Sequence, residues 1–518
     1  MDAVALEVVR HALAGVAEEM GAALRRASYS PNIKERADCS AAVFDADGVM
    51  VAQAEHIPVH LGSMPASVAA AIEAFGDRLA PGVQVLLNDP YQGGTHLPDL
   101  TLVAAVGDDD GSLLGYVANR AHHADVGGAA PGSMPADATD IAMEGIRVPP
   151  VVVADADGVR RDVLDVVAAS SRTPDERRGD LRAQFAANHV GARRLRELRG
   201  RWGADRLATA MAEVCDYAER RVRAAVAAIP DGVYTASDVL EVGDGVEIAA
   251  TVTVDGEEVV ADLTGSAPQV AAPLNAVRAV TVSSAYFCFR MLTDPDAPPN
   301  DGCYRPLTVR TTPGTIVHAS PPAPVAAGNV ETSQRIVDVL LAAFAAALPD
   351  RVPAASQGTM NNLLLGAASP AFSYYETIAG GEGATPERDG MSGVHTGMTN
   401  TRNTPAEALE LAYPLRVRRA ELRSGSGGRG RWHGGEGVVR EVEVTCDEAV
   451  LTLQTERRER GPWGLAGGED GAPGRNVVVR ADGRVEEVGA KGVWRLARGD
   501  RVRVETPGGG GWGPPDGA

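Results

Sequence analysis

The chain has few cysteines, few aromatic residues and no long uninterrupted apolar run. Its five cysteines, among 518 residues, are scattered and form no C-x-x-C pair, which argues against a disulfide framework and a thiolate zinc site. No window approaches the roughly eighteen consecutive apolar residues of a membrane-spanning helix. The sequence also begins without a basic stretch followed by an apolar block, so no signal peptide is expected. These absences together predict a cytoplasmic protein.

The charge balance and the missing motifs exclude further classes of protein. Acidic residues outnumber basic ones by 69 to 49, for a net charge of −20. Such a chain is not expected to bind nucleic acid by neutralising phosphates, and the excess of acidic residues favours solubility. No Rossmann fingerprint occurs, and the glycine run at 425–430 lacks the Lys-Ser/Thr ending of a P-loop. A Gly-x-Ser-x-Gly nucleophile elbow is also missing, so the chain shows neither a nucleotide site nor a serine hydrolase motif.

Composition and periodicity predict a multi-domain α+β protein. Apolar residues recur every three or four positions over 4–26, which is typical of an amphipathic helix, whereas residues 239–263 alternate as strands do. Glycine and proline are abundant, at 59 and 33 residues, and favour many turns. The glycine-rich end, 508–515, is expected to be loose. We expect four regions: a mixed α/β N-terminal region (1–165), a helical segment (166–230), a central α+β region (231–413) and a β-rich C-terminal region (414–518).

Two polar clusters lie beside predicted strands of the N-terminal region. Buried strands are predicted at 83–87, 100–106 and 113–119, and the clusters occupy 88–99 and 120–125. They therefore follow strand ends or lie in the adjoining loops. Functional groups are commonly held in such loops by a rigid scaffold.

Imidazole and carboxylate groups dominate both clusters. His96 and Asp99 are three residues apart across a Leu-Pro turn whose proline restricts the backbone. The second cluster supplies His122, His123 and Asp125. A lone His-x-x-Asp is more often structural, but the two clusters together favour a metal site, and this donor set suits zinc, manganese or iron. Because neighbouring strand residues face opposite sides, one of His122 and His123 should face the ion. The other could support it or act as an acid or base, and Asp125 could orient a ligand imidazole.

Several nearby groups have two interpretations. Asp38, in a charged stretch before an apolar strand, is either a solvated loop residue or a fourth ligand. Asp89 precedes Pro90 and is favoured as the acceptor of an Asx turn over a site carboxylate. His56 and His60 bracket a proline and could line the same pocket or be packed in the core.

Long motifs across nearly the whole chain resemble B-type subunits of the hydantoinase/oxoprolinase family. The stretches that carry the resemblance are Ser30–Arg36, His56–Pro65, the two clusters, Pro131–Pro135, Glu144–Pro150, Gly179–Gln184, Gly328–Arg335, Ser356–Asn362 and Tyr374–Gly381. Relatives include N-methylhydantoinase, 5-oxoprolinase, caprolactamase, and the acetone and acetophenone carboxylases. One departure is Gly397, which stands where many relatives have a histidine.

The resemblance implies a metal-dependent subunit that works with a partner. In the family an A-type subunit binds ATP and is thought to phosphorylate a lactam or enolate oxygen, and the B-type subunit acts on the activated species at a metal. By this resemblance His96, Asp99 and His122 are ligands, and Asp38 is the fourth. His123 or Asp125 would shuttle protons or hold the ligands in place.

The implied activity is ATP-dependent hydrolysis of a small cyclic amide, a lactam or hydantoin, in a hetero-oligomer with an A-type subunit. The alternative is a subunit of an ATP-dependent ketone carboxylase, which would require bicarbonate. A scaffold without enzymatic function is a third class. The complete ligand set argues against it, since a scaffold needs no such cluster.

Overall fold

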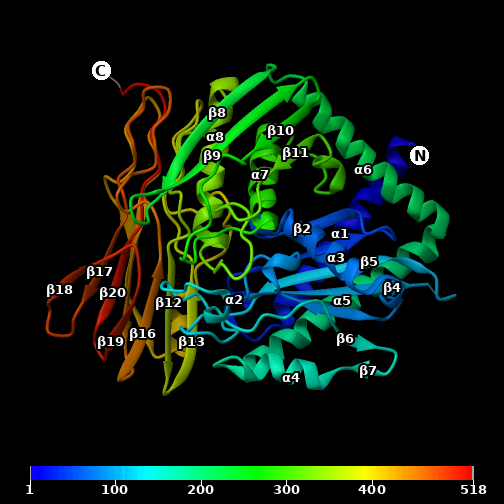
Figure 1. Ribbon diagram of the computed structural model, residues 1–518, viewed down its shortest axis with the longest axis horizontal. Coiled ribbons are helices and arrows are strands. Elements are labelled where there is room, and N and C mark those ends of the chain that lie inside the picture. The colour runs from blue at the N-terminus through cyan, green and yellow to red at the C-terminus, as the bar shows by residue number, and fades with distance from the viewer. Residues whose placement is uncertain (1, 109, 516–518) are drawn as a thin grey trace.

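The computed structural model describes residues 2–108 and 110–515 and has the expected multi-domain α+β architecture (Figure 1). A seven-stranded sheet forms the N-terminal part, a four-stranded sheet follows, and two further sheets lie at the C-terminal end. Among the described residues, no helix is both long and apolar enough to cross a membrane.

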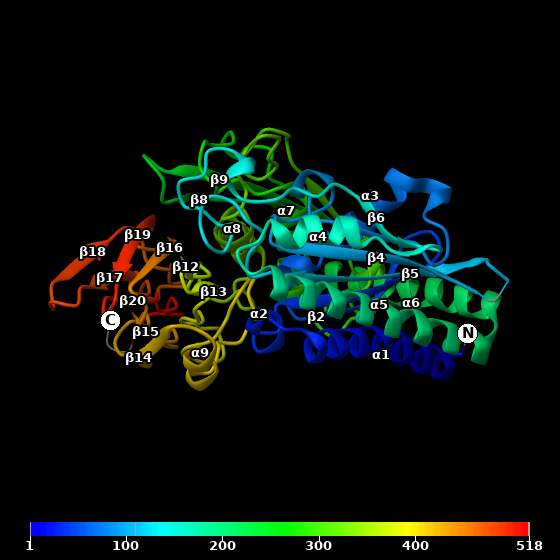
Figure 2. The ribbon, with the colours of Figure 1, turned by 90° about the horizontal axis from the view of Figure 1, so that it is seen from below.

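The N-terminal sheet is antiparallel between all neighbouring strands. Strands β1 and β4 are buried along their whole length, as their nearly continuous apolar sequences require. Helices α1 and α5 pack on this sheet next to α6, and Figure 2 shows the three running side by side. Helix α3 also contacts β4 and β5. In sheet order the strands are β2 (Met50–Glu55), β1 (Cys39–Phe44), β5 (Leu113–His122), β4 (Asp99–Gly107), β3 (Gln84–Leu87), β6 (Val151–Asp155) and β7 (Gly158–Val159).

The helices follow the predicted periodicity. Leu13, Val16 and Met20 of α1 point into an apolar core shared with β1, which confirms the predicted amphipathic helix. The long helical segment is interrupted at Gly203, where φ is 83°, a backbone conformation that favours glycine. The α-helices are α1 (Ala3–Ala27), α2 (Pro31–Lys34), α3 (Ser63–Phe75), α4 (Arg161–Ala169), α5 (Pro174–Trp202), α6 (Ala204–Val226), α7 (Arg278–Leu292), α8 (Ser333–Ala347) and α9 (Ala406–Ala412).

The remaining sheets complete the central and C-terminal parts. One has the order β11 (Leu307–Arg310), β10 (Glu258–Asp262), β9 (Val246–Asp255), β8 (Gly232–Leu240). The next has the order β13 (Ala371–Glu376), β12 (Asn362–Ala368), β16 (Glu448–Gln454), β19 (Lys491–Ala497). The last has the order β14 (Leu415–Arg423), β15 (Gly437–Val444), β20 (Arg501–Glu505), β17 (Arg475–Val479), β18 (Val485–Val488). Strands β12 and β13 precede residue 414 yet pair within a C-terminal sheet, so that sheet crosses the predicted region boundary.

The expectation of a loose glycine-rich end is wrong. Residues 506–511 are buried, and the amides of Gly509, Gly510 and Gly511 donate to the carbonyl oxygens of Gly435, Ala355 and Glu469. A Cβ on Gly509 would lie 2.0 Å from the Glu382 carbonyl oxygen. The glycines therefore allow close backbone packing instead of flexibility.

Candidate metal centre

Two antiparallel strands bring the predicted ligands together. Asp99 is the first residue of β4 and His122 the last of β5, and the two are direct cross-strand partners. His96 lies in the turn before β4, where its carbonyl oxygen accepts a hydrogen bond from the Asp99 amide at 3.1 Å. Side chains of directly opposed strand residues lie close on one face of the sheet, so the hairpin itself assembles the site.

The side chains of these three residues converge on one point. His96 Nε2 lies 3.3 Å from Asp99 Oδ1 and 3.1 Å from His122 Nδ1, and His122 Nδ1 lies 3.2 Å from Asp99 Oδ1. Three donors about 2.1 Å from one tetrahedral ion would be about 3.4 Å apart. The distances and the imidazole–carboxylate chemistry therefore fit a divalent ion. Each of the three residues offers one ligand atom, and these atoms all lie within 4.8 Å of one another. All three side chains are buried.

Neighbouring groups orient these ligands. Thr95 Oγ1 donates to Asp99 Oδ2 at 2.5 Å, and His96 Nδ1 lies 3.3 Å from the Ala326 carbonyl oxygen. That contact assigns the proton to His96 Nδ1 and directs the lone pair of Nε2 toward the cluster. Hydrogen bonds of this kind fix the tautomer and ring orientation of ligand histidines. His60 Nε2 lies 3.7 Å from Asp99 Oδ2.

The electrostatics of Asp99 suit a ligand. Burial alone would raise its pKa, but the imidazoles of His96, His122 and His60 outweigh burial and hold the pKa well below its usual range. Asp99 is therefore ionised at neutral pH and available to a cation. The His122 ring stacks on Tyr375, with ring centroids 4.6 Å apart, which restricts its rotation.

The other predicted residues are placed differently. His123 faces away from the cluster, with Nε2 3.0 Å from Gln184 Oε1, which confirms that adjacent histidines point to opposite sides. Burial and the nearby Arg177 guanidinium lower its pKa to about 4. Asp38 is buried, and its carbonyl oxygen accepts from the His122 amide at 3.1 Å. Its carboxylate does not join the three converging donors, so its role as fourth ligand stays a prediction.

Asp125 is not brought to the cluster. Its Oδ1 accepts from the amides of Gly127 and Arg172, and its Oδ2 accepts from the Gly132 amide and from Arg172 Nη1 at 2.9 Å. These donors use both carboxylate oxygens, so Asp125 organises a loop and an ion pair instead of orienting a ligand imidazole. Asp89 Oδ1 accepts from the Tyr91 amide at 3.1 Å, which confirms the Asx turn.

A segment far along the chain supplies contacts that the sequence patterns did not reveal. Asn329 Nδ2 lies 3.1 Å from His96 Nε2, and Glu144 Oε1 accepts from the amides of Val325 and Ala326 at 2.8 and 2.9 Å. Asn329 and Glu144 both belong to motifs that carry the family resemblance. Their positions in the sequence, however, do not indicate that either binds a metal or orients a metal ligand.

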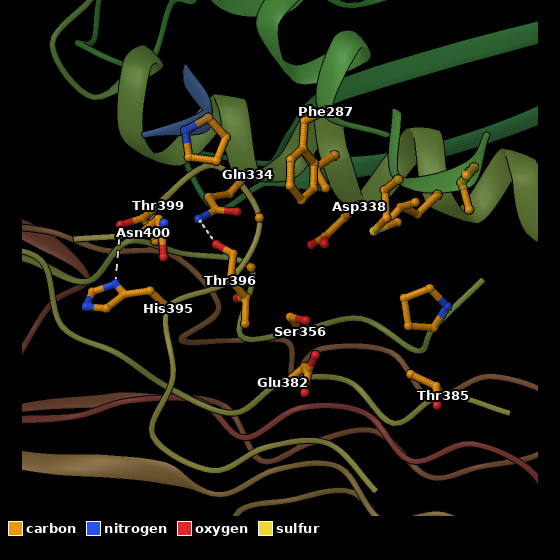
Figure 3. A pocket seen from close by; sticks show the side chains of 18 of the residues that line it. Phe287, Gln334, Asp338, Ser356, Glu382, Thr385, His395, Thr396, Thr399 and Asn400 are labelled. Carbon is orange, nitrogen blue, oxygen red and sulfur yellow. Dashed lines mark hydrogen bonds between the residues drawn. The ribbon is translucent and has the colours of Figure 1, made fainter. Parts of the chain in front are cut away.

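Figure 3 shows a cavity of about 500 Å³. Its wall includes Pro58, two residues before His60, but none of His96, Asp99 and His122. This volume suits a small-molecule site. Phe287 and Met291 contribute apolar side chains to the lining. Ser356 and Thr396, labelled in Figure 3, contribute polar groups. The irregular stretch 380–405 supplies much of the lining, as expected for a long irregular segment. A side chain at Gly397 would be strained, since φ is 63°, and it would have to displace Gln334, whose Oε1 lies 2.1 Å from the position of a Cβ.

Comparisons with known proteins identify the family. The sequence model of hydantoinase B/oxoprolinase matches residues 2–515. The chain belongs to this family. It is 38% identical over 523 residues to a 5-oxoprolinase from Dictyostelium discoideum, and the match covers 100% of this chain but 41% of that protein. The chain thus spans about two fifths of that oxoprolinase.

Two solved structures share the fold. The ATP-dependent caprolactamase from Pseudomonas jessenii has a TM-score of 0.92 and 30% identity, covering 99% of this chain and 91% of that chain. Acetone carboxylase, in a nucleotide-free structure, has a TM-score of 0.90 and 19% identity, covering 98% of this chain and 75% of that chain. The second likeness is one of fold alone.

Proposed function

We propose that this chain is the metal-dependent B-type subunit of an ATP-dependent cyclic amidase, which opens a lactam or hydantoin ring activated by an A-type subunit. The observation that carries the proposal is the buried convergence of His96, Asp99 and His122 in a member of the hydantoinase B/oxoprolinase family. The 5-oxoprolinase and caprolactamase relatives support a cyclic amide as the substrate class.

The ligand set defines what the chain itself contributes. Zinc, manganese or iron held by His96, Asp99 and His122 would supply Lewis-acid polarisation of a carbonyl or phosphoryl oxygen. Thr95 and the Ala326 carbonyl hold two of these ligands in orientation before substrate arrives. Such preorganisation is what makes electrostatic stabilisation effective in a buried site.

The way the chain uses its glycine run supports the proposal that a partner binds the nucleotide. The Gly427 amide donates to Glu436 Oε2, and the Gly428 amide donates to the Gly509 carbonyl oxygen at 2.9 Å. These amides are not available to cradle phosphate. The match covers 41% of the 5-oxoprolinase relative, and the proposal assigns ATP binding to an A-type subunit outside the aligned part.

The cavity of about 500 Å³ suits a small ring with a polar edge. Its apolar side can bury ring carbons while Ser356 and Thr396 hydrogen-bond an amide. The lining holds two arginines. Arg388 is paired with Glu382 through two contacts of 2.9 Å, and Arg351 Nη2 donates to the Leu292 carbonyl oxygen.

The decisive experiment is reconstitution with an A-type subunit. The complex is analysed for bound metal and assayed for ATP hydrolysis with hydantoins, 5-oxoproline, larger lactams and simple ketones, each with and without bicarbonate. We expect ATP turnover coupled to ring opening and independent of bicarbonate. Turnover that requires both a ketone and bicarbonate would instead establish the ketone carboxylase.

Removal of one ligand tests the site directly. We expect His96→Ala to lose the ion and the ring-opening activity together, because a three-donor site cannot hold an ion tightly with two donors. The matched control is His189→Ala, since His189 is an exposed imidazole on α5. Full activity of the His96→Ala complex without metal would contradict the proposal.

A further inference from the structure

Asn329 is directed at the point where the three ligands converge. Its Nδ2 lies 3.1 Å from His96 Nε2, the nitrogen that also faces Asp99 and His122. Asn329 is 4% exposed, and its Oδ1 has no hydrogen-bond partner within residues 2–108 and 110–515. The unpaired atom is thus the acceptor of this buried amide, whereas its donor, Nδ2, is the end that faces the cluster.

The backbone around Asn329 is held in place from several sides. Asn329 lies on a π-helical turn, η6 (Gly328–Thr332), which runs into α8. A Cβ on Gly328 would lie 2.0 Å from the Asn275 carbonyl oxygen, so glycine is required for this approach. Ser333 Oγ donates to the Asn329 carbonyl oxygen at 2.7 Å. A π-helical turn within an α-helix is often found at a functional site, and here it aims one side chain at the centre.

The contact with His96 cannot persist when an ion is bound. His96 Nδ1 carries the proton donated to the Ala326 carbonyl oxygen, so Nε2 offers the only lone pair of the ring. Once Nε2 binds an ion, that lone pair is no longer available to Asn329 Nδ2. The amide N–H then faces the coordination space as a buried donor without an acceptor, and a ligand oxygen at the centre would satisfy it.

We propose that Asn329 donates a hydrogen bond to the substrate oxygen bound at this centre, the carbonyl oxygen of the ring or the oxygen that carries its phosphoryl group. This inference rests on the proposed function. A neutral donor held in a water-poor site stabilises negative charge that develops on such an oxygen. Asn329 is in that case a catalytic residue, because it touches the reacting group, and it acts without losing or gaining a proton.

The test measures the binding of an oxygen ligand and does not depend on catalytic turnover. The full chain is loaded with Co²⁺, and its visible absorption is titrated with acetate as a simple oxygen ligand. We expect Asn329→Ala and Asn329→Leu to bind Co²⁺ within threefold of the wild-type affinity and to bind acetate at least 10-fold more weakly. The two variants differ in volume, so a defect in packing can be separated from loss of the donor.

The matched control is Asn188→Ala. Asn188 is a buried asparagine whose side chain hydrogen-bonds Asn119, Gln84 and the Leu102 carbonyl oxygen. Its removal should leave the acetate titration unchanged. In the reconstituted complex, Asn329→Ala should lower kcat about 100-fold, as loss of one oxyanion donor does elsewhere.

Three results would overturn the inference. Acetate affinity within threefold of wild type in both folded variants would show that Asn329 does not face the ligand oxygen. Loss of Co²⁺ from the variants would make Asn329 a metal ligand instead of a donor. A wild-type spectrum that does not respond to acetate would show that no ligand oxygen binds beside it. A wild-type chain that takes up no Co²⁺ would instead refute the metal centre itself.

Discussion

Glu144 is a buried carboxylate whose ionisation should destabilise the folded chain as the pH rises. Burial raises its pKa from 4.5 to about 8, although the amides of Ala326 and Val325 donate to it and oppose this effect. Its Oε2 has no partner within the described part of the chain. Well below pH 4.5, Glu144 is protonated in both the folded and the unfolded chain and does not lower the free energy of unfolding. Above that value the unfolded chain releases the proton first. The free energy of unfolding therefore falls with rising pH until the pH passes the folded-state pKa.

The size of this effect follows from the two pKa values. At about 1.4 kcal/mol per pKa unit, the full penalty above pH 8 is about 5 kcal/mol. Between pH 5 and pH 8 it grows by about 3.5 kcal/mol. Glu144→Gln removes the titration but keeps an oxygen that can accept both backbone amides. The free energy of unfolding of the variant, relative to wild type, should therefore rise by about 3.5 kcal/mol over this range.

Urea unfolding followed by tryptophan fluorescence, at several pH values and with EDTA present, measures this difference. Histidines titrate in both chains, so their contribution cancels when the two are subtracted. Glu331 offers a matched second variant, because burial also raises its pKa to about 8 and its Oε1 accepts from the Met360 amide and Asn362 Nδ2. A difference that stays constant from pH 5 to pH 8 in Glu144→Gln would refute the reasoning.

Two further predictions concern stability and thiol chemistry. Arg335→Met should lower the free energy of unfolding by about 3 kcal/mol, since it leaves the buried Glu456 and the half-buried Asp238 each short of one partner. Arg335 Nη1 contacts Asp238 Oδ2 at 2.9 Å, and its Nη2 contacts Glu456 Oε2 at 3.0 Å. Urea unfolding measures the change, and a variant as stable as wild type would contradict this prediction. All five cysteines are free and buried, and burial raises the pKa of Cys39 and of Cys215 to about 12. We expect negligible reaction with DTNB in the native chain and five thiols per chain after unfolding; a fast native reaction would show that a thiol is accessible.

The convergence of the three side chains could be anticipated from the sequence because it depends on one local element. Asp99 and His122 end two strands of a single hairpin, and a hairpin fixes which residues oppose one another. The alternation of side chains along a strand then separates His122 from His123. Donor chemistry pointed to both clusters but left His122 and His123 as alternatives. The family resemblance made the choice of His122.

The supporting contacts could not be predicted because they join distant segments. His96 meets the Ala326 carbonyl oxygen and the Asn329 amide across more than two hundred residues, and no periodicity reports such a meeting. A backbone carbonyl also has no sequence signature at all. Asp125 illustrates the opposite failure, since its place beside two histidines suggested a shared role. The amides of the loop that follows and Arg172 instead take both of its oxygens.

The two kinds of contact make the assembly of the site a consequence of how the N-terminal and central parts pack. The hairpin alone can bring Asp99 near His122, but the tautomer of His96 is set only when residues 325–329 reach it. Glu144 fastens that segment through the amides of Val325 and Ala326, and it comes from the N-terminal part of the chain. Glu144 and His96 thus both belong to the N-terminal part. Glu144 holds the 325–326 backbone of the central part, and the Ala326 carbonyl oxygen of that backbone orients His96. Any change that loosens this packing should weaken metal binding even where all three ligands remain.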